Sequence, residues 1–198
     1  VAIVGPRQCG KTTVARRLGG LYFDLEQPGD RLRLDAGWDK FIRGRPVIVL
    51  DEAQAYPDIF PRLRGAIDAA RRRNGRFVLL GSVSPRLFTG VSESLAGRMA
   101  VCEMTPFLVS EVRRGDRHWL VGGFPDGGIL APSRFPTWQR NFVDILSQRD
   151  LQNWGFDARP AFTSRFIRMI AASHGSIWNA SEIGRSLGVS YHTAQRYA

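Results

Sequence analysis

Short runs of β-branched and aliphatic residues alternate along the chain with longer segments whose apolar residues recur at helical spacing. Strands that alternate with helical segments are typical of a mostly parallel sheet whose faces are covered by helices. We therefore predict an α/β fold with a parallel sheet and flanking helices. The predicted strands lie near residues 1–4, 21–25, 47–51, 76–81 and 99–103.

The clearest predicted helix covers residues 58–73, where apolar side chains fall on one face. This segment ends in Arg71–Arg73, whose charge suits the negative end of a helix, and Asn74 with Gly75 can cap it. We interpret the arginine triplet as a solvated helix end, with a DNA-binding patch as the alternative.

A looser stretch rich in glycine and proline follows the fifth strand, and helical spacing resumes at residues 134–150 and 161–173. We interpret the apolar stripes of these two segments as packing surfaces rather than cofactor contacts. No internal repeat or low-complexity tract interrupts the order of elements.

The composition adds little to this picture. The chain has 198 residues, of which 43% are hydrophobic, enough for one sizeable core and a small second module. Its formal charge of +10 suggests a polyanionic partner such as nucleic acid. Only two of the 28 basic residues are lysines, Lys11 and Lys40, and GC-rich coding explains that ratio at least as well. The charge is therefore weak support for DNA binding.

The patterns of several other protein classes are missing. Cys9 and Cys102 lie far apart, and the three histidines have no metal-ligand spacing. The longest apolar runs, VIVL and FVLL, are too short to cross a bilayer. We expect a cytoplasmic protein with no membrane partner. Because the chain begins without methionine and stops within a helical pattern, we also expect it to be part of a longer protein.

Residues 5–12 read GPRQCGKT and follow the first predicted strand, as the pattern G-x-x-x-x-G-K-[ST] requires. Glycines let main-chain N–H groups converge on one anion, Lys11 can neutralise the β- and γ-phosphates of a nucleotide, and the Thr12 hydroxyl can hold Mg²⁺. The predicted nucleotide-binding residues are Gly5, Pro6, Arg7, Gln8, Cys9, Gly10, Lys11, Thr12 and Thr13.

A second motif, VIVLDEAQ at residues 47–54, is an apolar strand that ends in two carboxylates. A buried parallel strand presents such residues at its carboxyl edge, where Asp51 can hold Mg²⁺ together with Thr12. Glu52 can orient and deprotonate an attacking water. The two motifs predict hydrolysis of a nucleoside triphosphate. Transfer of phosphate to a small molecule is less favoured, because Glu52 supplies a base for water.

A third motif is RFVLLGSVSP at residues 76–85. In P-loop proteins with an acidic residue beside the metal-binding aspartate, a strand between the two motif strands ends in a polar side chain near the γ-phosphate. Ser82 is the predicted sensor of that phosphate, and Ser84 is the alternative.

Six segments of the chain, taken in order, are similar to those of a known family. They are GPRQCGKTTVAR, YFDLEQPGDRLRL, RPVIVLDEAQ, FVLLGSVSP, SESLAGRMAVCEMTPFLVSE and GGFPDG. The chain resembles the prokaryotic AAA+-like ATPases that carry a C-terminal domain of unknown function. The resemblance implies an ATP-binding P-loop domain over residues 1–130 and a helical continuation over 131–175. It also implies the truncated start of a winged-helix-like module over 176–198.

By the same resemblance, Arg98 is a candidate for an arginine that contacts the γ-phosphate, either in cis or from a neighbouring subunit after self-association. An ion pair with a surface carboxylate is the alternative. Asp24 and Glu26 match an acidic pair of the family, without a necessary chemical role. The turn at residues 122–125 matches too, either as a wall of the nucleotide site or as a simple tight turn.

The tail, residues 178–198, has the pattern of a helix-turn-helix: Asn179 and Glu182 can start a helix, Gly188 can end it and Ser190 can cap a second. The outward residues of that second helix that could read DNA are Tyr191, His192, Gln195 and Arg196.

These motifs fit two functions. The first is a Mg²⁺-dependent ATPase whose hydrolysis moves the C-terminal module. The second is a DNA-binding regulator that uses bound nucleotide as a switch with little turnover. Both need Lys11, and only the first needs Glu52. ATP is preferred over GTP because no guanine-reading motif such as NKxD is present.

Overall fold

The computed structural model of the chain describes residues 1–82, 94–112, 117–151 and 159–197. The chain forms two compact units, Val1–Ser133 and Arg134–Ala198, here called the N-terminal and C-terminal units. None of the described helices has the length and apolarity needed to span a bilayer.

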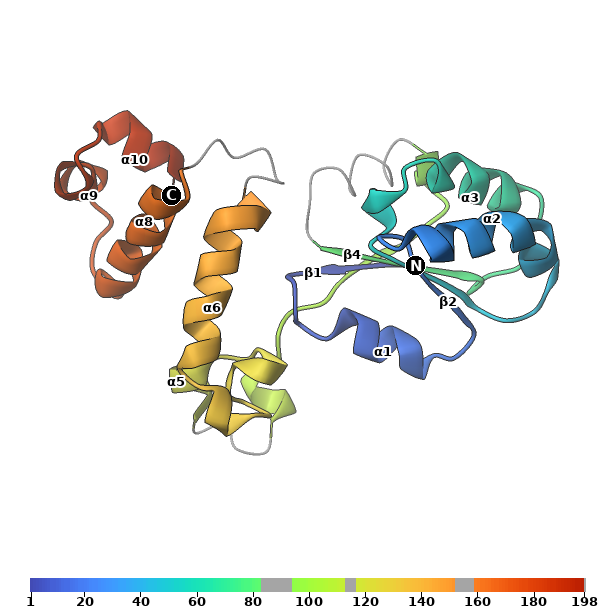
Figure 1. Cartoon of the computed structure of the whole chain (residues 1–198), viewed down its shortest axis with the longest axis horizontal. Helices are drawn as coiled ribbons and strands as arrows, with labels where there is room; N and C mark the ends of the chain where they lie inside the picture. Colours follow the sequence, from blue (N-terminus) through green and yellow to red (C-terminus); the bar gives the residue numbers. More distant parts are fainter. Residues whose placement is uncertain (83–93, 113–116, 152–158, 198) are drawn as a thin grey trace. The chain divides into compact units, whose positions relative to one another are not determined.

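A five-stranded parallel sheet forms the centre of the N-terminal unit (Figure 1). Its strands lie in the order β2-β3-β4-β1-β5. The five predicted strands are confirmed, each to within two residues at either end. The strands are β1 (Ala2–Gly5), β2 (Leu21–Asp24), β3 (Ile48–Asp51), β4 (Phe77–Ser82) and β5 (Val101–Glu103).

Helices cover both faces of the sheet, with α1 on one side and α2 and α3 on the other (Figure 1). Every residue of β3 and β4 is buried, as expected for parallel strands covered on both faces. Side chains alternate between the two faces. Ile48 and Leu50 join the core beneath α2 and α3, whereas Val49 joins Ala15 of α1. The helices are α1 (Lys11–Arg17), α2 (Pro28–Arg43) and α3 (Ile59–Asp68), and the 3₁₀ turn η1 (Ala53–Ala55) follows β3.

Helix α3 ends five residues earlier than the sequence pattern predicts, so Arg71–Arg73 lie beyond its end. The Ala66 carbonyl, which would accept from the Ala70 N–H in a longer helix, instead accepts from Arg76 Nη1 at 2.9 Å. The Ala70 N–H turns to the Ile67 carbonyl at 3.1 Å. A side chain beyond the helix therefore satisfies a terminal carbonyl and closes the helix.

Short helical turns follow β5: η2 (Val109–Glu111), α5 (His118–Val121), η4 (Pro125–Gly127) and η5 (Pro132–Arg134). The turn at residues 122–125 packs against Phe107. The Phe107 N–H donates to the Gly123 carbonyl at 2.9 Å, and a Cβ on Gly123 would lie 2.2 Å from the Phe107 carbonyl oxygen. Glycine at this position is required by the close approach of two main chains.

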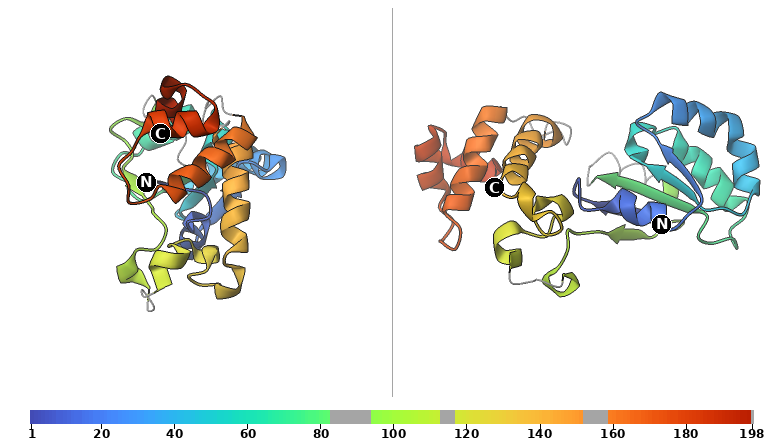
Figure 2. Two further views of the ribbon diagram at one scale, coloured as in Figure 1. Left: turned by 90° about the vertical axis from the view of Figure 1, so that its left-hand side faces the viewer. Right: turned by 60° about the horizontal axis from the view of Figure 1, so that its bottom comes forward.

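The C-terminal unit is helical (Figures 1 and 2). The predicted helix over 134–150 begins later, at Thr137, and its last turn is a π-helix; the one over 161–173 is confirmed to within one residue. Phe166 packs with Ile183 and Leu187 to form a small core. The elements are α6 (Thr137–Ile145), η6 (Leu146–Asp150), α8 (Pro160–Ala172), α9 (Ala180–Leu187) and α10 (Tyr191–Tyr197).

Helix α9 has the two ends that the sequence predicts. The Asn179 side-chain oxygen accepts from the N–H groups of Ser181 and Glu182, both at 3.1 Å. Gly188 follows the last turn with a φ of 71°, in the left-handed region that ends helices. The Ser190 hydroxyl accepts from the Thr193 N–H at 3.2 Å and starts α10.

We predict that Asn179→Ala lowers the free energy of unfolding of the C-terminal unit by about 1 kcal/mol, because two N–H groups lose their acceptor. Denaturant unfolding followed by circular dichroism measures the change. Asn179→Asp keeps an acceptor at the same place and should be close to neutral. Equal losses in the two variants would contradict the capping role.

Candidate functional site

The loop between β1 and α1 has a strained, glycine-dependent backbone. Gln8 has a φ of 64° and Gly10 a φ of 107°, both in the left-handed region. Gly5 leaves no room for a side chain, because a Cβ there would lie 2.1 Å from the Met104 carbonyl oxygen. Cys9 is buried beneath the loop, and its thiol donates to the same oxygen at 3.5 Å. The loop is therefore packed directly against the segment that leaves β5.

Lys11 is 94% buried and turns back into this loop. Its Nζ donates to the carbonyl oxygens of Gly5 at 2.9 Å and Pro6 at 2.8 Å. No carboxylate of the described residues forms an ion pair with it. A buried ammonium is thus held by neutral main-chain acceptors at the carboxyl edge of the sheet.

The metal-binding pair predicted from sequence is brought together. Thr12, in the first turn of α1, donates from Oγ1 to Oδ2 of Asp51 at 2.7 Å. Asp51 ends β3 and is buried. Its other oxygen, Oδ1, accepts from the Glu52 N–H at 3.0 Å. Thr13, next along α1, is exposed to solvent.

Tyr22 was missed by the sequence prediction. Its hydroxyl donates to Oδ2 of Asp51 at 2.7 Å, the same oxygen that Thr12 contacts. Tyr22 pairs with Val49 in the sheet, so it shares the α1-facing side with Asp51 two residues further along β3. Burial and then the Asp51 hydrogen bond raise the pKa of Tyr22, so its hydroxyl remains a donor at neutral pH.

Glu52 follows Asp51 with a φ of 49°, an uncommon conformation for a residue with a side chain. Such strain costs on the order of 1–3 kcal/mol and is concentrated at functional sites. Its carboxylate accepts from Gln54 Nε2. The side-chain oxygen of Gln54 is buried with no partner among the described residues. The acid is therefore held in a fixed place at the end of β3.

Strand β4 lies between β1 and β3, and its last residue, Ser82, is paired with Gly5. Ser82 is 4% exposed, and its hydroxyl has no hydrogen-bond partner in the described part of the chain. Buried polar groups without partners are rare in proteins, and within the described residues this hydroxyl remains available to a ligand beside the loop. Ser84, the alternative sensor, lies outside the described residues.

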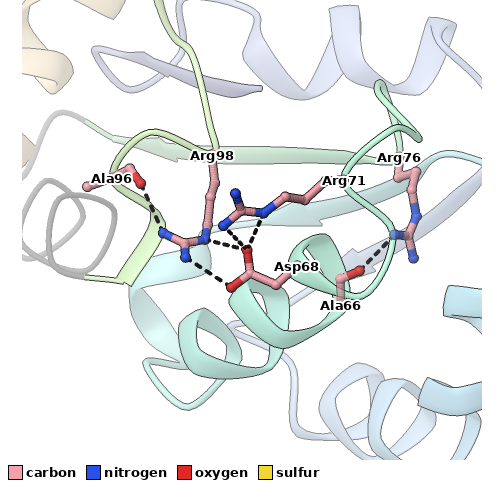
Figure 3. Close-up of polar contacts among 6 residues, drawn as sticks. All are labelled: Ala66, Asp68, Arg71, Arg76, Ala96 and Arg98. Atoms are coloured by element: carbon pink, nitrogen blue, oxygen red, sulfur yellow. Dashed lines mark hydrogen bonds and ion pairs between the residues drawn. The ribbon is translucent and has the colours of Figure 1, made fainter.

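Arg98 is not brought to this site. It lies two residues before Ala100, whose carbonyl accepts from the Ala2 N–H at the start of β1, whereas the loop follows the end of β1. Its guanidinium pairs with Asp68 of α3, with Nε at 2.9 Å and Nη2 at 3.0 Å from the carboxylate (Figure 3). The ion pair named as the alternative is thus present.

The tail forms the two helices α9 and α10. Some of the α10 side chains predicted to read DNA already contact other side chains of the tail. The Gln195 amide oxygen accepts from Trp178 Nε1 at 3.4 Å, and the Tyr191 and His192 rings lie edge to face at 5.4 Å. Arg196 is exposed.

The loop and its neighbours suit a nucleoside triphosphate with Mg²⁺. The buried Lys11 ammonium and the unpartnered Ser82 hydroxyl are groups that phosphate oxygens satisfy. The Thr12 hydroxyl and Asp51 carboxylate are the hard oxygen ligands that Mg²⁺ prefers.

Comparison with known proteins agrees with this geometry. The family model of the AAA domain matches residues 1–113, and that of a domain of unknown function, DUF8612, matches residues 113–198. Uncharacterized proteins of Mycobacterium tuberculosis and Mycobacterium bovis are each 37% identical over 204 residues, which cover 100% of this chain and 46% of the relative. The chain thus spans about half the length of these relatives. The predicted resemblance is confirmed for the AAA part, not for a winged helix.

Because the first of these family models accounts for more than half of the residues, the chain belongs to the AAA domain family.

Proposed function

We propose that the chain binds ATP with Mg²⁺ at residues 5–13 and hydrolyses it. The observation that carries this proposal is the buried Lys11 ammonium, whose partners within the described residues are main-chain carbonyls alone. A buried cation is costly unless it is paired. A triphosphate in the loop supplies the missing anion, and membership of the AAA domain family favours ATP as its source.

In this proposal each residue has one task. Lys11 exchanges its carbonyl partners for the β- and γ-phosphate oxygens. Thr12 and Asp51 hold Mg²⁺, which neutralises charge on the phosphates. Glu52 takes a proton from the attacking water as the water oxygen bonds to the γ-phosphorus and the bond to ADP breaks. Ser82 donates its free hydroxyl to the γ-phosphate.

The finer parts of the proposal have separate support. The two compact units are compatible with a cycle in which hydrolysis moves the C-terminal unit. An arginine finger is compatible only with a second copy, whose Arg98 would leave Asp68. The competing function, a nucleotide-switched DNA-binding regulator, uses Lys11 and the tail but has no use for Glu52.

We predict that Glu52→Gln retains ATP binding and lowers the rate of hydrolysis by about 10²- to 10⁴-fold, because the amide cannot accept a proton from water. Calorimetry with Mg·ATP and phosphate release measure the two properties. Glu26→Gln, an exposed acid after β2, is the matched control and should hydrolyse at the parent rate. Equal turnover in Glu52→Gln and the parent would exclude Glu52 as the base.

We predict that Lys11→Ala weakens ATP binding by about 10- to 100-fold, because a charge-assisted contact with phosphate is lost. The chain provides a matched control in Lys40→Ala, which removes its only other lysine from the exposed side of α2. Calorimetry measures both affinities. If Lys11→Ala binds ATP as tightly as the parent does, the nucleotide does not bind at this loop.

We predict that Tyr22→Phe raises the Mg²⁺ concentration for half-maximal nucleotide binding by about 10-fold, because the hydroxyl that orients Asp51 is removed. Calorimetric titration at fixed ATP gives this value independently of turnover. Tyr56→Phe removes a hydroxyl bonded to Asp35, away from the loop, and should leave the Mg²⁺ dependence unchanged. A shift of the same size in both variants would argue against the orienting role.

A further inference from the structure

Three loops bring arginines to the amino-terminal edge of the sheet, opposite the phosphate loop. Arg43 ends α2 and Arg45 lies in the loop that follows it into β3, and the loop into β4 carries the segment 71–76 with its four arginines. Arg98 precedes β5. Because all strands are parallel, the segments that enter them meet at one edge.

Two adjoining hollows lie at this edge. The larger, of about 630 Å³, is lined by Arg43, Arg45, Arg72, Arg73 and Arg76. The other, of about 380 Å³, shares Arg73 and Arg76 with it and adds Arg71 and Arg98. None of the described lining residues is acidic.

Several of these guanidinium groups are fixed by the main chain. Arg73 Nη2 donates to the Gly44 carbonyl at 2.7 Å, and Arg76 donates to the carbonyls of Ile42 and Ala66, both at 2.9 Å (Figure 3 shows the Ala66 contact). Carbonyl acceptors hold a guanidinium in place without neutralising its charge. The cations are therefore positioned in advance of any ligand.

Neutralising charge is scarce here. Asp68 pairs with both Arg71 and Arg98, so that one carboxylate serves two cations (Figure 3). Burial, and then the positive charge of Arg73, lower the pKa of Arg76. Arg45 and Arg72 are exposed and have no hydrogen bond or ion pair within the described residues. The one carboxylate paired with this set, Asp68, therefore serves two of its seven arginines, and the edge keeps an excess of positive charge within the described residues.

We propose that this edge binds the phosphodiester backbone of nucleic acid. Planar guanidinium groups match phosphate oxygens in two-point contacts. Seven of them, spread over two shared hollows, suit successive phosphates of a linear polyanion better than one compact anion. Arg43 ends a helix and the other arginines lie on loops, so none of them is carried along a helix that enters a groove, and we expect the binding to be independent of base sequence. This inference does not depend on ATP hydrolysis.

The test compares the parent chain with the double variant Arg45→Ala, Arg72→Ala. Fluorescence anisotropy of a labelled 20-base-pair duplex measures the affinity of each at several salt concentrations between 50 and 200 mM. We expect the slope of log affinity against log salt to fall by about 2, and the affinity at 50 mM salt to fall at least about tenfold, because two phosphate contacts are lost. Arg45→Lys with Arg72→Lys keeps both charges and should restore most of the slope.

The matched control is Arg64→Ala with Arg165→Ala, which removes two exposed arginines outside the hollows and should bind duplex as the parent does. Lys11→Ala should also retain duplex binding, and this separates the edge from the nucleotide site. Parent-like affinity and slope after loss of Arg45 and Arg72 would overturn the proposal. So would loss of binding only in Gln195→Ala with Arg196→Ala, or binding to vesicles of anionic lipid without binding to duplex.

Discussion

The buried ammonium of Lys11 is the constraint on which the site depends. Removing such a charge from water is costly unless fixed dipoles or counter-charges replace the lost hydration. The carbonyls of Gly5 and Pro6 do this only because the backbone between β1 and α1 folds back around the side chain. The same fold sets where α1 begins, and so places Thr12 against Asp51. The position of the Lys11 ammonium is thus tied to the conformation of the loop, to the start of α1 and to the contact between α1 and the end of β3.

Much of this could be predicted from sequence because the signals are local. Alternating strands and helices gave the sheet, and the two motifs placed Lys11 and Asp51 at its carboxyl edge. Tyr22 could not be found in this way, since its part depends on the register of β2 against β3. The length of α3 depends on Arg76, ten residues after the carbonyl that it satisfies. Such distant partners leave no trace in helical periodicity.

The place of Arg98 is a different case, because the sequence did contain the needed information. A residue before a parallel strand lies at the amino edge, whereas the loop of Lys11 follows its strand and lies at the carboxyl edge. The resemblance implied a contact with the γ-phosphate, whereas in the structure the Arg98 guanidinium pairs with Asp68. The two edges thus differ in their side chains: Lys11, Asp51 and Glu52 lie at the carboxyl edge, and the two hollows lined by arginines lie at the amino edge.

Met104 shows what close packing at the loop entails. Its main-chain N–H donates to the Val4 carbonyl at 2.7 Å, and its carbonyl oxygen occupies the space where Gly5 would carry a side chain. The main chain of Met104 therefore leaves the loop no space to move toward this side. A shift of the loop toward this side would have to displace the main chain that leaves β5, so Met104 links the conformation of the loop to the segment that follows β5.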